Sequence, residues 1–60
     1  MGEPDRLLTI DEAAARLSVS RWTVYREHKR GKLRFVKVRG GTRVRATEIE
    51  RYLRAAERAA

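Results

Sequence analysis

The 60-residue sequence predicts a mainly α-helical domain with one small β-hairpin. Two observations indicate helices, because the Thr-x-x-Glu motifs at 9–12 and 47–50 each precede apolar residues spaced three and four apart. A third observation indicates the hairpin, since valines alternate with cations on both sides of Gly40 and Gly41. A chain of this length without cysteine buries only about 60% of its unfolded surface, so its core must be small.

The first helix begins behind a capping box. We expect the Thr9 hydroxyl to accept from the N–H of Glu12, and the Glu12 carboxylate to accept from the N–H of Thr9. The inward stripe of this helix consists of Ile10, Ala13, Ala14 and Leu17. A short turn over residues 18–20 follows.

A second helix is expected over residues 21–30. Ser20 is a natural N-cap for it, and Gly31 can adopt the left-handed conformation that ends a helix. Val24 and His28 lie one turn apart on its inward edge. We therefore expect His28 to be a half-buried core residue.

Residues 33–45 form the predicted hairpin, and the loop length sets its register. A two-residue loop at 40–41 would place Val38 opposite a cation and mix apolar and charged side chains on each face. A three-residue loop at 40–42 places Val38 opposite Val44. Because one face must be buried, we expect the three-residue loop.

The third helix should open at the second capping box, with Thr47 as its cap. Its inward stripe consists of Ile49, Tyr52, Leu53 and Ala56. Residues 1–6 are expected to be a flexible N-terminus and residues 7–60 a single domain. The predicted order is helix, tight turn, helix, hairpin, helix.

Basic residues are concentrated in one part of the chain. Ten of the fifteen Lys and Arg residues lie between Arg21 and Arg45 with a single acid, Glu27, so this stretch carries a charge of +9 in a chain of net charge +7. The segments on either side are balanced or slightly acidic. A polyanion is the default partner for such a charge distribution.

The two short helices and their tight turn form a helix-turn-helix unit, whose second helix lies in the major groove of double-stranded DNA. Here the second helix is the basic one. At 100° per residue, the side opposite Val24 is expected to carry Trp22, Arg26, Lys29 and Arg30. Arg26 is the candidate for reading a guanine through O6 and N7. The expected DNA-binding residues of this helix are Ser20, Arg21, Trp22, Thr23, Tyr25, Arg26, Lys29 and Arg30. Ser20, Arg21, Thr23 and Tyr25 suit phosphates, which fix register without reading sequence.

The hairpin adds the expected DNA-binding residues Arg39, Gly40, Gly41, Thr42 and Arg43. Arginines beside a flexible tip suit a wing that follows the adjacent minor groove. A hairpin tip requires glycine for its own geometry as well. Two roles stay open for Trp22: contact with a base or sugar, and packing against protein, either the first helix or another molecule.

Catalysis finds no support in the residues. One histidine, no cysteine and no glycine-rich phosphate loop leave no nucleophile–base pair and no metal-ligand set. We expect no enzyme activity, no catalytic residue, no metal and no cofactor. No apolar run approaches the ~18 residues of a membrane span, and no signal peptide is evident, so a cytoplasmic location is expected.

The run LTIDEAAARLSVSRWTVY at residues 8–25 resembles the L-T-x-x-E-A-A-x-x-L-x-V-S-x-x-T-V-Y opening of excisionase-type, MerR-like winged helix-turn-helix domains. The resemblance covers residues 7–53. It implies DNA binding by the second helix and the wing, with Trp22 and Arg26 approaching bases and the wing tip in the minor groove. Ser18 stands where the family usually has a turn glycine, so we expect it to take a positive φ at some cost in strain. Glu27 and His28 replace residues that are usually apolar, and are expected to weaken the core.

Single-domain members of this family are often phage or mobile-element excisionases, also called recombination directionality factors. The resemblance therefore implies DNA recombination: an accessory protein that binds adjacent sites with other copies of itself, bends the DNA and directs an integrase towards excision in a bacterial host cell. A small MerR-like transcriptional regulator is the alternative. From the charge alone, a module that docks on an acidic protein also stays open, whereas RNA and membrane surfaces fit less well.

Overall fold

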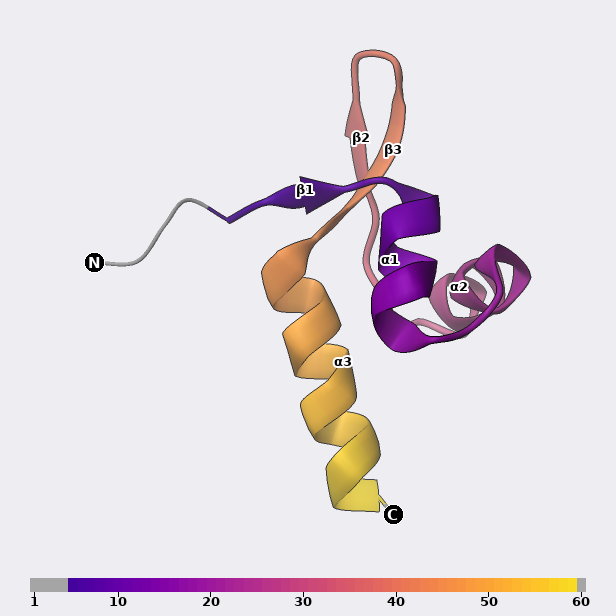
Figure 1. Ribbon diagram of the computed structural model, residues 1–60, viewed down its shortest axis with the longest axis vertical. Helices are drawn as coiled ribbons and strands as arrows, with labels where there is room; N and C mark the ends of the chain where they lie inside the picture. Colours follow the sequence, from indigo (N-terminus) through magenta and orange to yellow (C-terminus); the bar gives the residue numbers. More distant parts are fainter. Residues whose placement is uncertain (1–4, 60) are drawn as a thin grey trace.

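The computed structural model describes residues 5–59. The elements follow in the order β1 (Leu7–Leu8), α1 (Ile10–Leu17), α2 (Arg21–Lys29), β2 (Val36–Val38), β3 (Gly41–Arg45) and α3 (Ala46–Ala59). β3 is the central strand of a three-stranded antiparallel sheet of order β1-β3-β2. The β2–β3 hairpin and α3 extend in opposite directions from the body of the molecule (Figure 1). The mainly helical winged architecture is thus confirmed, with β1 as an unexpected third strand.

Both helices of the helix-turn-helix unit begin at the predicted caps. Thr9 Oγ1 accepts from the N–H of Glu12 at 3.1 Å, and Glu12 Oε1 accepts from the N–H of Thr9 at 2.8 Å. Ser20 Oγ accepts from the N–H of Thr23 at 3.2 Å. These bonds satisfy backbone donors that a helix start leaves without partners.

Left-handed residues follow both helices, as expected. Ser18 has a φ of +58° and its N–H donates to the last turn of α1. Gly31 has a φ of +81°, and its N–H donates to the carbonyl of His28 at 2.9 Å. The strain expected at Ser18 is therefore present in the turn that joins α1 to α2.

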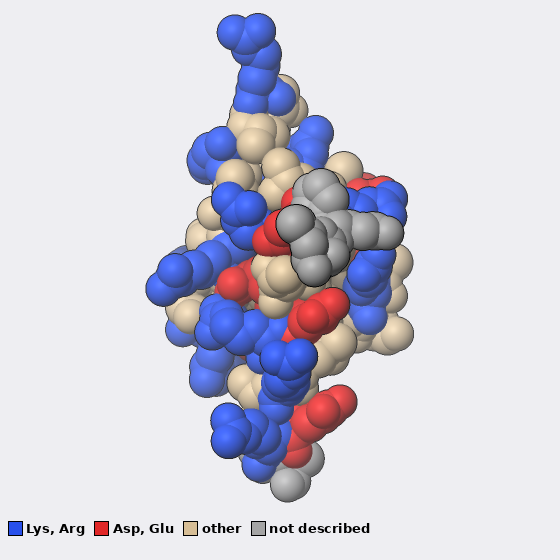
Figure 2. Space-filling model, turned by 90° about the vertical axis from the view of Figure 1, so that its left-hand side faces the viewer, with Lys and Arg blue, Asp and Glu red and all other residues tan. Residues whose placement is uncertain are grey.

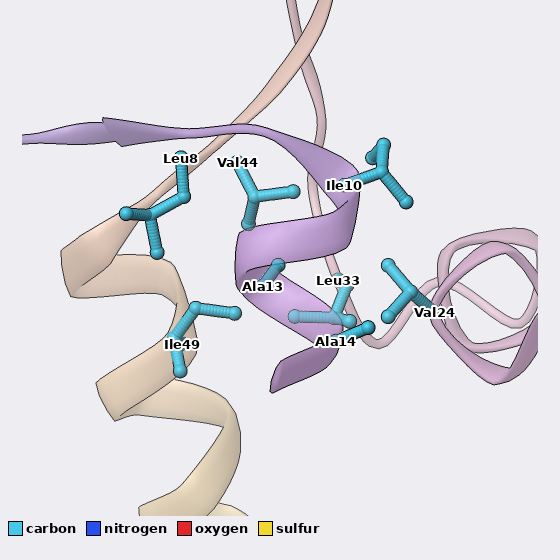
Figure 3. Close-up of a cluster of buried hydrophobic side chains, with 8 residues drawn as sticks. All are labelled: Leu8, Ile10, Ala13, Ala14, Val24, Leu33, Val44 and Ile49. Atoms are coloured by element: carbon cyan, nitrogen blue, oxygen red, sulfur yellow. The ribbon is translucent and has the colours of Figure 1, made fainter. Parts of the chain in front are cut away.

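Eight apolar side chains form the core between α1, the sheet, α2 and α3 (Figure 3): Leu8, Ile10, Ala13, Ala14, Val24, Leu33, Val44 and Ile49. Leu17, Phe35 and Tyr52 are partly buried against it. The expected α3 stripe is covered only in its first half, because the second half of the helix extends past the other elements (Figure 1). Leu53 is 40% exposed and Ala56 is exposed, so their predicted burial is wrong.

The hairpin register differs from the prediction. Val38 lies opposite Gly41, which leaves Arg39 and Gly40 as a two-residue loop. Gly40 has a φ of +93°, a conformation that glycine adopts readily in tight turns. The expected three-residue loop over 40–42 is therefore wrong.

The prediction failed because it sought the apolar partner of Val44 within the hairpin. That partner is Leu8 of β1, which lies directly opposite Val44 across the sheet, and both side chains are buried. The valines of β2 are only partly buried. A two-residue strand has no detectable alternation, so the sequence pattern could not reveal it.

The start of α3 is held by the N-terminal segment and not by the predicted capping box. Because α3 begins at Ala46, Thr47 lies inside the helix. Asp5 accepts from the N–H of Thr47 at 3.1 Å and from its hydroxyl at 2.6 Å. The N–H of Ala46 donates to the carbonyl of Arg6 at 2.8 Å. Residues 1–6 were expected to be flexible, but Asp5 and Arg6 form hydrogen bonds with the start of α3. Residues 1–4 lie outside the described residues.

Replacing Ser18 by glycine should stabilise the protein by about 1 kcal/mol, because glycine adopts a positive φ without steric cost. Urea unfolding followed by circular dichroism measures the change. Ser20→Gly is the control, since it removes a cap at extended backbone and should destabilise by roughly a few tenths of a kcal/mol. A Ser18→Gly variant no more stable than the parent would contradict the strain assigned to this turn.

Acidification should destabilise the fold through its capping carboxylates. The hydroxyl and N–H of Thr47 lower the pKa of Asp5 below its ordinary 3.8, and the N–H of Thr9 lowers the pKa of Glu12 below its ordinary 4.5. The unfolded chain therefore binds more protons, so this stabilisation is complete above the ordinary values and is lost as the pH falls through the folded ones. The urea concentration at the midpoint of unfolding, measured from about pH 7 to about pH 3, should therefore decrease as the pH approaches the low end of this range. Asp5→Asn should be less stable at neutral pH and should show a flatter dependence; identical profiles would refute the role of Asp5.

Candidate nucleic-acid interface

α2 buries one side and exposes the other. Val24 is fully buried, whereas Trp22 is 73% exposed and Tyr25 is 42% exposed. With Arg26 and Lys29, these two rings line a hollow of about 270 Å³ on the outer face of the helix, which we call the α2 hollow. Their spacing of three and four residues brings them together on one face. Trp22 thus contributes little to the packing of its own chain.

A second hollow of about 260 Å³, the wing hollow, lies between α2, the start of α1 and the hairpin. Its lining residues are Thr9, Ile10, Asp11, Arg21, Tyr25, Gly40, Gly41, Thr42 and Arg43. Tyr25 lines both hollows. The outer face of α2 therefore continues directly into the hairpin, and together the two hollows hold nine of the thirteen residues expected to bind DNA.

The other four expected residues lie outside the hollows. The hydroxyls of Ser20 and Thr23 lie 3.2 Å apart at the start of α2. Arg39 is exposed in the hairpin loop. Arg30 donates to the carboxylate of Glu27 at 3.3 Å and lines a third hollow beside α3, so it is separated from the Trp22 face on which it was expected.

Arg43 is folded along its own strand. Its Nη1 donates to the carbonyl of Thr42 at 3.0 Å. A Cβ placed on Gly41, which has a φ of +149°, would lie 3.1 Å from the same Nη1. The guanidinium is the far end of a flexible side chain and can shift by the few tenths of an ångström required, so it is the positive φ that favours glycine at position 41.

The segment that links α2 to the hairpin is held from both sides. The ring Nδ1 of His28 lies 2.8 Å from the carbonyl of Leu33, which is itself a core residue at 1% exposure. The N–H of Arg34 donates to Glu48 of α3 at 3.1 Å. Burial raises the pKa of Glu48, but the hydrogen bonds it accepts outweigh burial and keep the pKa below its ordinary 4.5. The base of the wing is thereby tied to both helices.

Phe35 joins the aromatic residues of α2 to this segment. The His28 ring stacks on Phe35 with centroids 3.8 Å apart and an interplanar angle of 6°. Tyr25 meets Phe35 edge-on at 5.8 Å. His28 is an exposed residue that covers Phe35, so its expected half-burial in the core is wrong. Sequence reasoning missed Phe35, because neighbouring cations and valines marked it only as a strand residue.

Glu27 connects the end of α2 to α3. It accepts from the Tyr52 hydroxyl at 3.0 Å as well as from Arg30, and its side chain is 13% exposed. Burial and the Glu27 carboxylate raise the pKa of Tyr52. Glu27 therefore lies beside the core with its charge partnered, where the sequence had suggested a weakened core.

Basic side chains extend well beyond the two hollows. On the face shown in Figure 2 they run from the hairpin towards the end of α3, with acidic side chains among them. Two of the arginines outside the hollows are paired with carboxylates, Arg45 with Asp5 and Arg51 with Glu48. Among the described residues, none of those lining the α2 hollow is acidic, and Asp11, 3.6 Å from Arg21, is the acid that lines the wing hollow. The cations between 21 and 45 thus do not all gather on one surface.

Within residues 5–59, no helix is both long and apolar enough to cross a membrane. The same residues contain no group of three or more His, Cys, Asp or Glu side chains placed to hold a metal ion.

A family model described as a helix-turn-helix domain matches residues 7–57. Comparison with curated proteins and with solved structures gives no match. The matched range contains the α1–turn–α2 unit, both hollows and most of α3. The chain therefore belongs to the helix-turn-helix domain family, a fold that binds double-stranded DNA.

Proposed function

We propose that the protein binds double-stranded DNA sequence-specifically, with α2 in the major groove and the hairpin along the adjacent minor groove. The observation that carries this proposal is the continuity of the α2 hollow with the wing hollow through Tyr25. A duplex presents its two grooves side by side, so one continuous surface suits both. The basic lining of the α2 hollow matches the charge of the phosphates.

The exposed side chains divide into two roles. We assign Arg26 to the reading of a guanine, because a guanidinium can bond O6 and N7 together. Lys29 and Arg21, which line the two hollows, are assigned to phosphate contacts. Ser20 and Thr23, at the start of α2, can also bind phosphates. Arg39, exposed in the hairpin loop, is assigned to the minor groove.

Within this function, we propose the narrower role of an excisionase that bends DNA and directs an integrase. Its support is the resemblance of residues 7–53 to excisionase-type domains, together with size. A single module buries only about 600–1,000 Å² of protein surface on DNA, so useful specificity requires several copies on neighbouring sites. The protein would act without catalysis, on DNA in the cytoplasm.

Replacing Arg26 by alanine should weaken specific duplex binding by about 5- to 150-fold, equivalent to about 1–3 kcal/mol. A site selected from random duplexes and an electrophoretic shift assay provide the measurement. If about five phosphates are contacted, log K against log salt should have a slope near −4.5.

The matched control is Arg54→Ala, which removes an exposed arginine of α3 outside both hollows and should change affinity by less than about twofold. Equal losses in the two variants, or binding that is indifferent to salt, would contradict the proposed interface.

Cooperative assembly tests the excisionase role. Footprinting on DNA with adjacent sites should show that the sites become occupied at the same protein concentration. Duplexes with phased sites should reveal a bend. Addition of a site-specific integrase should then shift its products towards excision. Independent occupancy of single sites on unbent DNA would leave a transcriptional regulator as the better description.

A further inference from the structure

Trp22 and Tyr25 leave an unusual amount of aromatic surface uncovered. Both rings stand on the outer face of α2, and Arg26 and Lys29 complete the lining of the hollow. Trp22 is 73% exposed, so most of its apolar surface is left uncovered by its own chain. The α2 hollow is therefore an apolar patch inside a basic surface, and its occupant must suit both properties.

Charge restricts what can cover this patch. Arg26 and Lys29 lie at its edge, and no acidic residue is among those described as lining it. An anionic partner is favoured, and α2 is the helix that the proposed function places in the major groove. The major-groove edge of DNA offers one apolar substituent, the 5-methyl group of thymine.

We propose that the α2 hollow reads a thymine methyl group, and that this thymine lies within two base-pair steps of the guanine read by Arg26. Trp22 and Arg26 are four residues apart, which is about 6 Å along the helix axis. Successive base pairs are about 3.4 Å apart, so the two side chains reach base pairs that are at most two steps apart. The inference rests on the proposed DNA binding and extends it to a specific chemical group.

Deoxyuridine tests the inference cleanly, because it removes the methyl group and keeps the base-pairing edge and O4. Each thymine of a selected duplex is replaced in turn, and the dissociation constant is measured by fluorescence anisotropy. One replacement should weaken binding by about fourfold, the effect of leaving one methyl group uncovered. In Trp22→Ala the same replacement should have no effect, since the ring that covers the methyl is gone.

Leu53→Ala is the matched control, because Leu53 is also an exposed apolar residue but lies on α3 outside the hollow. It should retain the full methyl effect. Circular dichroism shows whether Trp22→Ala is folded. If it is not, Trp22→Phe replaces it in the test; this variant keeps an aromatic ring and should retain part of the methyl effect.

Two outcomes overturn the inference while leaving DNA binding intact: no thymine is sensitive to loss of its methyl group, or the sensitivity is unchanged in Trp22→Ala and Trp22→Phe. Tighter binding of single-stranded than duplex DNA through Trp22 would assign the ring to base stacking and would overturn it too. Failure of the proposed DNA binding would give a different result: selection from random duplexes would yield no preferred site, and Arg26→Ala would bind duplex DNA as the parent protein does.

Discussion

The position of the wing relative to α2 depends on Leu33. This residue lies in the short segment between the two elements, and its side chain is buried among residues from α1, α2, α3 and the sheet. The carbonyl of Leu33 lies within hydrogen-bond distance of His28, and the next N–H donates to Glu48. Three independent contacts therefore meet within two residues of the chain.

Such a clamp matters for a surface that must fit two grooves at once. A wing that moved freely would have to be ordered on binding, and that ordering would reduce affinity. Phe35 extends the clamp outwards, since it touches both Tyr25 and His28 of α2 just before β2 begins. The residue shared by the two hollows, Tyr25, is thus held by the same aromatic cluster that fixes the base of the wing.

The parts of the fold set by local chemistry were predictable from the sequence. The capping box at Thr9, the cap at Ser20 and the left-handed Gly31 each depend on residues within one helical turn. The errors about the α3 cap and the hairpin register concern partners that are far apart in the chain. Thr47 is capped by Asp5, 42 positions away, and Val44 pairs with a strand too short to recognise. Helical periodicity and charge contain no information about such partners.

The candidate site was also predicted in part. A rotation of 100° per residue placed Trp22, Arg26 and Lys29 on one outer face, and they line one hollow. It also placed Arg30 there, but Arg30 donates to Glu27 and lines a different hollow, beside α3. A cluster of cations along the sequence is therefore not a single surface in space, as the pairing of Arg30 with Glu27 shows.

The central claim is that α2 and the wing present one continuous DNA-binding surface. Backbone amide and indole chemical shifts, followed by NMR while the selected duplex is titrated, test it most directly. We expect the largest changes to occur together at Trp22, Tyr25 and Arg26 and at Gly40 and Gly41, with small changes in the second half of α3. Changes centred on α3, or confined to the helix with the wing unaffected, would contradict it.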